Sequence, residues 1–247
     1  MKETLVFRVD ASSEMGIGHV IGRLNQMSKT TEQMAEWQGV FGKEYTDRNV
    51  LTLDEMEDLY RRNFGVTKTD LNKRFLSGMD HSIRILEVGC NVGNQLFSLQ
   101  RMGFQNLYGI ELQPYAIKLC RQSTQNIKVV CGSAFDIPFE DGYFDLVFTS
   151  GVLVHIHPSD IVEVMKEIHR CAKDYIWGFE YWAPEYTEVI YRGHPNLLWK
   201  TDFAALYMRE FSDLVLVKEE RLKYRFNDDV DSVFLLRKTK QFRVFPD

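Results

Sequence analysis

Cysteine is scarce in this sequence, and none of it is arranged to bind a metal ion. The four cysteines are Cys90, Cys120, Cys131 and Cys171. They form no Cys-x-x-Cys pair, and no histidine lies near them at the spacing of a zinc site. We therefore expect four reduced thiols in the protein core and no metal centre.

Long apolar segments and blocks of like charge are also absent. No stretch approaches the roughly 18 apolar residues of a membrane span, and the first residues lack the charged-then-apolar pattern of a signal peptide. The 30 Lys and Arg residues are outnumbered by 35 Asp and Glu residues, which gives a net charge of −5 without the basic stripe of a nucleic-acid binder. These absences predict a cytoplasmic protein that contacts neither membrane nor nucleic acid and whose partner is a small molecule.

What the sequence does contain, from Ile83 onward, is a regular alternation of β-rich runs and helical stretches. The predicted strands lie at 83–88, 107–110, 127–130, 144–148 and 175–179, and the helices between them at 94–102, 114–123 and 158–171. Such alternation is typical of a parallel sheet with right-handed crossovers. Two later β-rich runs, 214–226 and 232–236, flank a turn at Asn227 and predict an antiparallel hairpin. We expect one main α/β domain with a doubly wound sheet.

The segment before the alternation has a helical pattern. Four apolar or aromatic residues recur at intervals of three to four and mark one face of a predicted helix over 33–47: Met34, Trp37, Phe41 and Tyr45. A second helix is predicted over 53–63. Residues 27–82 are therefore expected to form a helical cap on the sheet.

A glycine-containing turn follows the first predicted strand. The sequence Glu87-Val-Gly-Cys-Asn-Val-Gly93 runs directly into a helix. Because Gly89 and Gly93 lack a Cβ, the chain can turn sharply and a ligand can lie against the backbone at the carboxyl edge of the sheet. The motif resembles the first motif of the class I methyltransferases, an acid followed by three glycines at alternate positions. Asn91 replaces the middle glycine and tolerates left-handed backbone angles.

This resemblance implies a Rossmann-like fold, with a seven-stranded, mostly parallel sheet and a C-terminal antiparallel hairpin. It also implies S-adenosyl-L-methionine as the cofactor. The contacts that it implies in this turn are Glu87, Gly89, Cys90, Asn91 and Gly93. The alternative is that the glycines only shape a tight connection between strand and helix.

The ends of the next two strands extend the resemblance. Strand two ends at Glu111, whose carboxylate can accept hydrogen bonds from both ribose hydroxyls. The loop after strand three resembles the loop that holds the adenine ring in these enzymes, although Ser133 stands where the family more often has Asp. Asp136 is expected to form a turn. The implied cofactor contacts are Glu111, Leu112, Ser133, Ala134 and Phe135.

The segment after strand four faces the methyl donor in the family, and here it runs from Ser150, an expected cofactor contact, to His157. Methyl transfer to a hydroxyl or a protonated amine is helped by a general base, and His155 suits that task by its pKa. The alternative is that His155 packs within the loop and His157 caps the following helix.

A segment over 180–212, dense in aromatic and polar residues, follows strand five. Class I enzymes place acceptor contacts here, and aromatic faces with acids and a histidine would suit a sugar. We expect Glu180 to act with His155 in catalysis. The expected acceptor contacts are Tyr181, His157 and His194. The alternative is a hydrophobic lid.

Two residues of the helical cap are candidates for the cofactor's amino-acid end. The Arg48 guanidinium can make two parallel hydrogen bonds to a carboxylate, and Tyr45 can cover the methionine portion. Equally, both can lie on a solvated helix end.

Residues 27–237 resemble a narrower group, the methylases associated with pseudaminic acid biosynthesis. The resemblance rests on Thr30-Thr-Glu-Gln33, Trp37, Phe41-Gly, Tyr45, Arg48-Asn49 and Glu87-Val-Gly-Cys-Asn-Val-Gly-Asn94. It implies a nonulosonic acid or a nucleotide-sugar intermediate of surface glycan biosynthesis as the acceptor.

The first stretch resembles a different protein of the same pathway. The sequence from Phe7 to Val20 is similar to the start of the UDP-sugar hydrolase, but only about its first strand and turn are present. We expect residues 1–26 to be a fused remnant or an overextended start, and residues 83–240 to be the cofactor-binding core.

The sequence therefore predicts an S-adenosylmethionine-dependent methyltransferase that acts on a small molecule. A nicotinamide-dependent oxidoreductase is disfavoured by the Gly-x-x-x-Gly spacing and by the terminal hairpin. A non-catalytic cofactor-binding or scaffold protein of a glycan operon stays open as an alternative.

Overall fold

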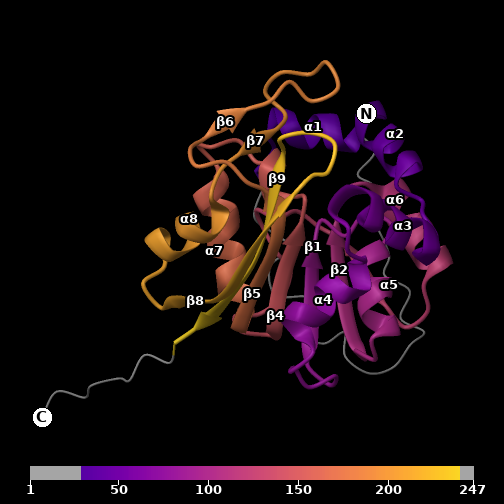
Figure 1. Ribbon diagram of the computed structural model, residues 1–247, viewed down its shortest axis with the longest axis vertical. Helices are drawn as coiled ribbons and strands as arrows, with labels where there is room; N and C mark the ends of the chain where they lie inside the picture. Colours follow the sequence, from indigo (N-terminus) through magenta and orange to yellow (C-terminus); the bar gives the residue numbers. More distant parts are fainter. Residues whose placement is uncertain (1–28, 240–247) are drawn as a thin grey trace, which may run out of the picture.

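A computed structural model describes residues 29–239, whose centre is a seven-stranded sheet with the order β3-β2-β1-β4-β5-β9-β8 (Figure 1). Its strands are β1 (Arg84–Val88), β2 (Asn106–Glu111), β3 (Lys128–Cys131), β4 (Phe144–Ser150), β5 (Ala172–Tyr181), β8 (Leu214–Lys223) and β9 (Val230–Lys238). Strands β1 to β5 pair in parallel, and β9 is antiparallel to both β5 and β8. The predicted α/β fold, with its mostly parallel sheet and C-terminal antiparallel strand pair, is confirmed.

The strand order reverses next to β1. The chain proceeds outward from β1 to β2 and β3 and then returns to β4 on the other side of β1. Val88 at the end of β1 is consequently in register with Ile110 of β2 and with Thr149 of β4. Open α/β sheets bind ligands outside the carboxyl ends of the strands at such a reversal.

Helices cover both faces of the sheet. The longer helices are α1 (Glu32–Gln38), α2 (Val40–Arg48), α3 (Leu53–Phe64), α4 (Lys68–Leu76), α5 (Asn94–Arg101), α6 (Pro114–Ser123), α7 (Ile161–Cys171) and α8 (Phe203–Glu210). One hydrophobic core lies between the sheet and α7 and α8, and the other lies between the sheet and α4, α5 and α6, with α3 packed against it. None of the helices within 29–239 has the length and apolar character needed to cross a bilayer.

Helix α7 shows how the sequence pattern produces this packing. Its apolar residues Ile161, Val164, Met165 and Ile168 follow the i, i+3, i+4, i+7 spacing of one helix face, and each is at most 2% exposed. The helix begins at Ile161, three residues after the predicted start at Pro158.

The predicted single helix over 33–47 is wrong, because the chain breaks at Gly39. Gly39 ends α1 and begins α2, with an extended ψ of −158°. The two helices approach closely at Gly42, where a Cβ would lie 1.7 Å from the carbonyl oxygen of Trp37. Two glycines in one amphipathic pattern thus allow a bend that the spacing of the aromatic residues does not reveal.

Two helices, α4 and α8, were not predicted. Each follows a residue whose side chain accepts a hydrogen bond from the backbone three residues later, Thr67 and Asp202 respectively. Such N-caps were the available signal. Helix α8 and the short antiparallel strands β6 (Thr187–Glu188) and β7 (Trp199–Lys200) occupy the predicted acceptor-side segment.

Two other expectations concern the N-terminus and the cysteines. The segment 1–26, expected to be a remnant of another protein, lies outside the described residues. The expectation of four buried thiols is wrong for Cys131, which is exposed at the end of β3, whereas Cys90, Cys120 and Cys171 are buried.

Candidate functional site

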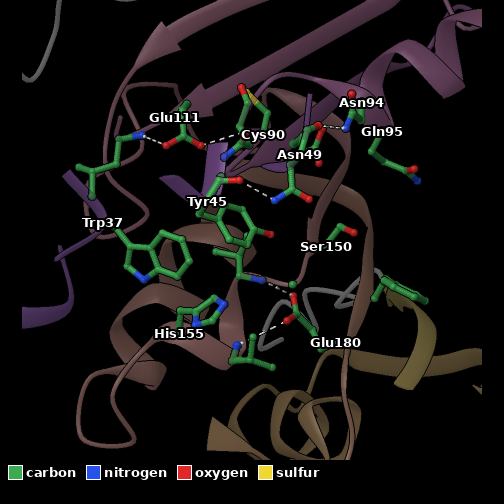
Figure 2. Close-up of a pocket in the computed structure, with 18 of the residues that line it drawn as sticks. Trp37, Tyr45, Asn49, Cys90, Asn94, Gln95, Glu111, Ser150, His155 and Glu180 are labelled. Atoms are coloured by element: carbon green, nitrogen blue, oxygen red, sulfur yellow. Dashed lines mark hydrogen bonds between the residues drawn. The ribbon is translucent and has the colours of Figure 1, made fainter. Parts of the chain in front are cut away.

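A cleft of about 390 Å³ opens where the central strands end. Glu87, Glu111, Ser150 and Glu180, which lie at or near the carboxyl ends of β1, β2, β4 and β5, line it, and residues of α1 and α2 form one wall (Figure 2). This volume is in the range of small-molecule sites. The predicted position of the site, at the carboxyl edge of the sheet, agrees with this cleft.

The turn after β1 needs its first glycine for two reasons. Gly89 has a left-handed φ of 73°, and a Cβ there would lie 2.7 Å from Cγ2 of Val152 in the loop after β4. Asn91 is also left-handed, with φ of 46°, and its side chain donates to Oγ1 of Thr46 on α2 at 3.2 Å. The asparagine at the middle glycine position therefore also connects the turn to the helical cap.

Gly89, Cys90 and Asn91 line the cleft, but the predicted contact Gly93 does not. Gly93 is the N-cap of α5 with φ of 81°, and a Cβ there would lie 2.5 Å from Sγ of Cys120. Its role is to start the helix close to α6.

The carboxylate of Glu111 joins two turns of the site. Oε2 accepts a hydrogen bond from the backbone of Asn91, and Oε1 accepts from the backbones of Leu112 and Gln113, each at 2.8 Å. Burial raises the pKa of Glu111, and the three N–H groups oppose that rise. A carboxylate has about four acceptor positions. Glu111 therefore retains acceptor capacity toward a hydroxyl in the cleft.

The loop after β3 contributes the predicted residues Ser133, Ala134 and Phe135 to the cleft. The Ser133 hydroxyl accepts a hydrogen bond from the backbone of Phe135 at 3.2 Å and so holds the loop in shape. Asp136 is not among the residues that line the cleft and forms a bridge with Ser133, in keeping with its expected turn role.

Glu180 has different contacts from those expected of a catalytic acid. Its carboxylate is 1% exposed and accepts hydrogen bonds from the backbones of Val152 at 3.2 Å and Val154 at 3.4 Å (Figure 2). Burial raises its pKa to about 7, and these hydrogen bonds oppose the rise. Each oxygen thus accepts one hydrogen bond from the loop that carries His155. These contacts support a role for Glu180 in positioning this loop, beside the predicted role in catalysis.

His155 lies in the short helix η2 (Leu153–His155) and faces the cleft. The centre of its ring lies 4.5 Å from that of Trp37 (Figure 2). Its Nδ1 is 2.7 Å from the carbonyl oxygen of Leu197. Since a carbonyl can only accept, Nδ1 carries the proton and Nε2 carries the lone pair. Burial lowers the pKa of His155 to about 4, so the ring is neutral at physiological pH.

Replacing His155 with glutamine should reduce the acid sensitivity of the fold. The folded state keeps this ring neutral down to about pH 4, whereas the unfolded chain binds the proton near pH 6.5. Between these values the unfolded state binds more protons, so lowering the pH destabilises the wild type by up to about 3 kcal/mol through this residue. Urea titrations of both proteins across this window measure the difference. If the free energy of unfolding had the same pH dependence in both proteins, the fold would not keep His155 neutral.

Helix α2 presents one face to the cleft. Gly42, Tyr45, Thr46 and Asn49 follow the i, i+3, i+4, i+7 spacing and line it. Arg48 does not fall on this face, is exposed and is absent from the lining, so the structure does not bring this predicted cofactor contact to the cleft. The Tyr45 ring projects into the cleft between Asn49 and Trp37 (Figure 2).

The predicted acceptor contacts are only partly brought together. Tyr181 and His157 line the cleft, and Nδ1 of His157 also makes a 2.7 Å hydrogen bond with the Ser159 hydroxyl. His194 is exposed and lies outside the cleft, with its ring against Phe41, so the structure does not bring it together with the other predicted acceptor contacts. Tyr191 lines the cleft in its place.

A group of polar and aromatic residues lies at the β9 side of the cleft, and the sequence analysis named only Tyr181 among them. We call it the Lys68 pocket, and its members are Tyr60, Lys68, Phe179, Tyr181, Tyr224 and Asp231. Lys68 is 2% exposed and Asp231 is 3% exposed. A lysine directly after the N-cap Thr67 and an acid at the start of an apolar strand were weak signals for these two residues.

The comparisons with known proteins agree with this geometry. Residues 86–175 match the family model described as a methyltransferase domain. The mouse mitochondrial tRNA N(3)-cytidine methyltransferase METTL8 is 34% identical over 94 residues, 33% of this chain and 34% of that protein. The Arabidopsis thaliana 24-methylenesterol C-methyltransferase 2 is 29% identical over 96 residues, 36% of this chain and 26% of that protein.

This chain thus spans about a quarter to a third of the length of these curated relatives. By name they act on a tRNA and on a sterol, so they give no single acceptor class. The predicted exclusion of nucleic acid is not supported by them.

Solved structures match over a larger part of the chain. The Burkholderia thailandensis 1,6-didemethyltoxoflavin-N1-methyltransferase, solved with 1,6-didemethyltoxoflavin and S-adenosylhomocysteine, has a TM-score of 0.64 and 16% identity, over 87% of this chain and 92% of that chain. The PH0226 protein from Pyrococcus horikoshii OT3 has a TM-score of 0.60 and 18% identity, over 83% and 99% of the two chains. These similarities show that the chain has the Rossmann-like methyltransferase fold.

Proposed function

We propose that this chain, whose residues 86–175 form a methyltransferase domain, transfers a methyl group from S-adenosylmethionine to a small molecule. The observation that carries the proposal is the buried carboxylate of Glu111, which ends β2 within the cleft and retains acceptor capacity. The comparisons support methyltransferase activity for residues 86–175, and we propose it for the whole chain.

The residues of the cleft fit the adenosyl group. Glu111 would accept from the ribose hydroxyls, and Ser133, Ala134 and Phe135 would surround the adenine ring. At position 89 the absence of a Cβ lets a ligand lie against the backbone of the turn after β1. We also propose that Tyr45, rather than Arg48, covers the methionine portion.

When bound, the sulfonium supplies an electrophilic methyl group. The protein's own task is then to align the acceptor and to exclude water. Trp37 and Tyr45 pack edge to face, 5.0 Å apart, on the wall of the cleft. Nε2 of His155 keeps its lone pair at neutral pH and can receive a proton from the acceptor, although a pKa of about 4 makes it a weak base.

For the acceptor, we propose a sugar acid of the nonulosonic type or a nucleotide-sugar intermediate of surface glycan biosynthesis. The support is the resemblance of residues 27–237 to pseudaminic acid-associated methylases, together with the aromatic and polar lining around Tyr181 and Tyr191. The partly enclosed cleft under α1 and α2 favours a small acceptor over a nucleic acid.

Calorimetric titration with S-adenosylhomocysteine tests the cofactor, with NADH as the control ligand. We expect the first to bind and the second not to bind. Gly89→Arg should abolish binding, because its side chain would enter the space of Val152 and the backbone is left-handed at this position. Binding of neither ligand to folded wild-type protein would refute the proposal. Cofactor binding without turnover on any sugar would support a non-catalytic role.

A further inference from the structure

The Lys68 pocket contains a buried cation whose hydrogen-bonding capacity is only partly used. Nζ of Lys68 donates to the Tyr60 hydroxyl at 2.8 Å and lies 4.5 Å from the centre of the Phe179 ring. Burial lowers the pKa of Lys68 to about 8, and Glu87 and Asp231 oppose that fall, so the ammonium stays charged at neutral pH. An ammonium has three N–H donors. Lys68 can therefore donate to a ligand in the cleft.

Asp231 supplies an unused acceptor in the same pocket. Its Oδ2 accepts a hydrogen bond from the Tyr224 hydroxyl at 3.1 Å. Its Oδ1 is buried and has no hydrogen-bond partner within residues 29–239. Leaving a buried polar atom without a hydrogen-bond partner destabilises the fold. Asp231 lines the cleft, so a ligand hydroxyl bound beside it could supply the missing partner.

Aromatic rings form the rest of the pocket. The rings of Tyr181 and Tyr224 are stacked with centres 6.1 Å apart, and Phe64 packs against Tyr224 at 4.6 Å. Such surfaces pack well against the C–H face of a sugar ring. The pocket thus offers one cation, one free carboxylate oxygen and an apolar surface.

The position of the pocket separates it from the cofactor. Glu111 on β2 and Asp231 on β9 stand four strand spacings apart in the sheet order, roughly 19 Å. The ribose and the terminal carboxylate of the cofactor are separated by about eight bonds, which span roughly 10 Å when extended. The extended part of a cofactor whose ribose contacts Glu111 spans only about half of that separation, which leaves room for an acceptor at the β9 side.

We propose that the Lys68 pocket is the acceptor subsite and that it binds a hydroxylated carboxylic acid of the sugar-acid class. Lys68 Nζ donates to the acceptor's carboxylate, and Asp231 Oδ1 accepts a hydrogen bond from one of its hydroxyl groups. This inference rests on the proposed function, because it assigns the acceptor end of the same cleft.

Ligand-observed NMR titration tests the assignment. The probes are N-acetylneuraminic acid and its methyl ester, added to protein saturated with S-adenosylhomocysteine and to protein without it. We expect the acid to bind about tenfold or more tightly than the ester, because charge-assisted hydrogen bonds are about twice as strong as neutral ones. Lys68→Met should remove the preference for the acid over the ester, and Asp231→Asn should lower the affinity for both probes.

Two variants serve as matched controls. Lys73→Met makes the same change on the exposed side of α4, and Asp228→Asn makes the same change at an exposed residue of the β8–β9 turn. Both should bind the probes as the wild type does. S-adenosylhomocysteine affinity, measured for every variant, reports whether the cleft is intact.

The possible outcomes separate the two proposals. Failure of S-adenosylhomocysteine to bind the wild type would overturn both. Normal S-adenosylhomocysteine binding without binding of the sugar acid would overturn this inference alone. Loss of S-adenosylhomocysteine affinity in Lys68→Met, with sugar-acid binding unchanged, would assign the lysine to the cofactor's carboxylate and also overturn it.

Discussion

Replacing Glu111 with alanine is expected to weaken the binding of S-adenosylhomocysteine by about a hundredfold. The change removes the proposed ribose acceptor and also leaves three backbone N–H groups, of Asn91, Leu112 and Gln113, without their acceptor. Each buried donor without a partner costs about 1–3 kcal/mol, part of which appears as disorder of the two turns that line the cleft. Calorimetry with the purified variant measures the loss.

Glu111→Gln separates the two contributions. A glutamine side chain has one acceptor oxygen in place of two, so it can keep the bonds to Leu112 and Gln113 or the bond to Asn91, but not both sets. We expect an affinity between those of the wild type and the alanine variant. Glu140→Ala, at an exposed position away from the cleft, is the control. Unchanged affinity in Glu111→Ala would place the ribose elsewhere.

Removing the Glu180 side chain should lower the free energy of unfolding by about 2–4 kcal/mol. Its carboxylate holds the backbone of Val152 and Val154 in the turn after β4, and its deletion leaves these donors and a small cavity in the interior. Urea denaturation of Glu180→Ala measures the loss. Glu185→Ala, at an exposed position four residues from the end of β5, should change stability little. If both substitutions lowered the free energy of unfolding equally, Glu180 would have no special role in positioning the loop.

Glu180→Gln should also change the pH dependence of stability, in the opposite sense to His155→Gln. The folded state holds the Glu180 proton up to about pH 7, whereas the unfolded chain releases it near pH 4.5. Between these values the folded state binds more protons, so this residue's contribution to stability falls as the pH rises. The glutamine variant should lack that decline. The same urea titrations, repeated across this window, measure it.

The sequence predicted which residues line the β1 and β2 side of the cleft because local patterns determine their positions. Alternating strands and helices bring the carboxyl ends of consecutive parallel strands to one edge, and the residues that follow them, from Gly89 to Asn91 and at Glu111, come with their strands. Even if a strand boundary is predicted with an error of one residue, such a residue is still expected at the same edge of the sheet. The fold and this half of the site are therefore predictable from short segments.

The acceptor side depends on long-range packing that no short segment encodes. Lys68 and Asp231 are far apart in the sequence. They line the same cleft because α4 packs against one face of the sheet, in a core that includes residues of β5 and β9. Arg48 has the right chemistry to bind a carboxylate, but it does not lie on the face of α2 that lines the cleft. The bend at Gly39 determines which face of α2 is turned toward the cleft, and the spacing of the aromatic residues does not predict this bend.

The bend between α1 and α2 is tied to the sheet by one side chain. Nε2 of Gln113, directly after β2, lies within 3.4 Å of the carbonyl oxygens of Trp37, Gln38 and Gly39. The cleft wall that α1 and α2 form is therefore held in place from the end of β2, by a side chain that itself lines the cleft.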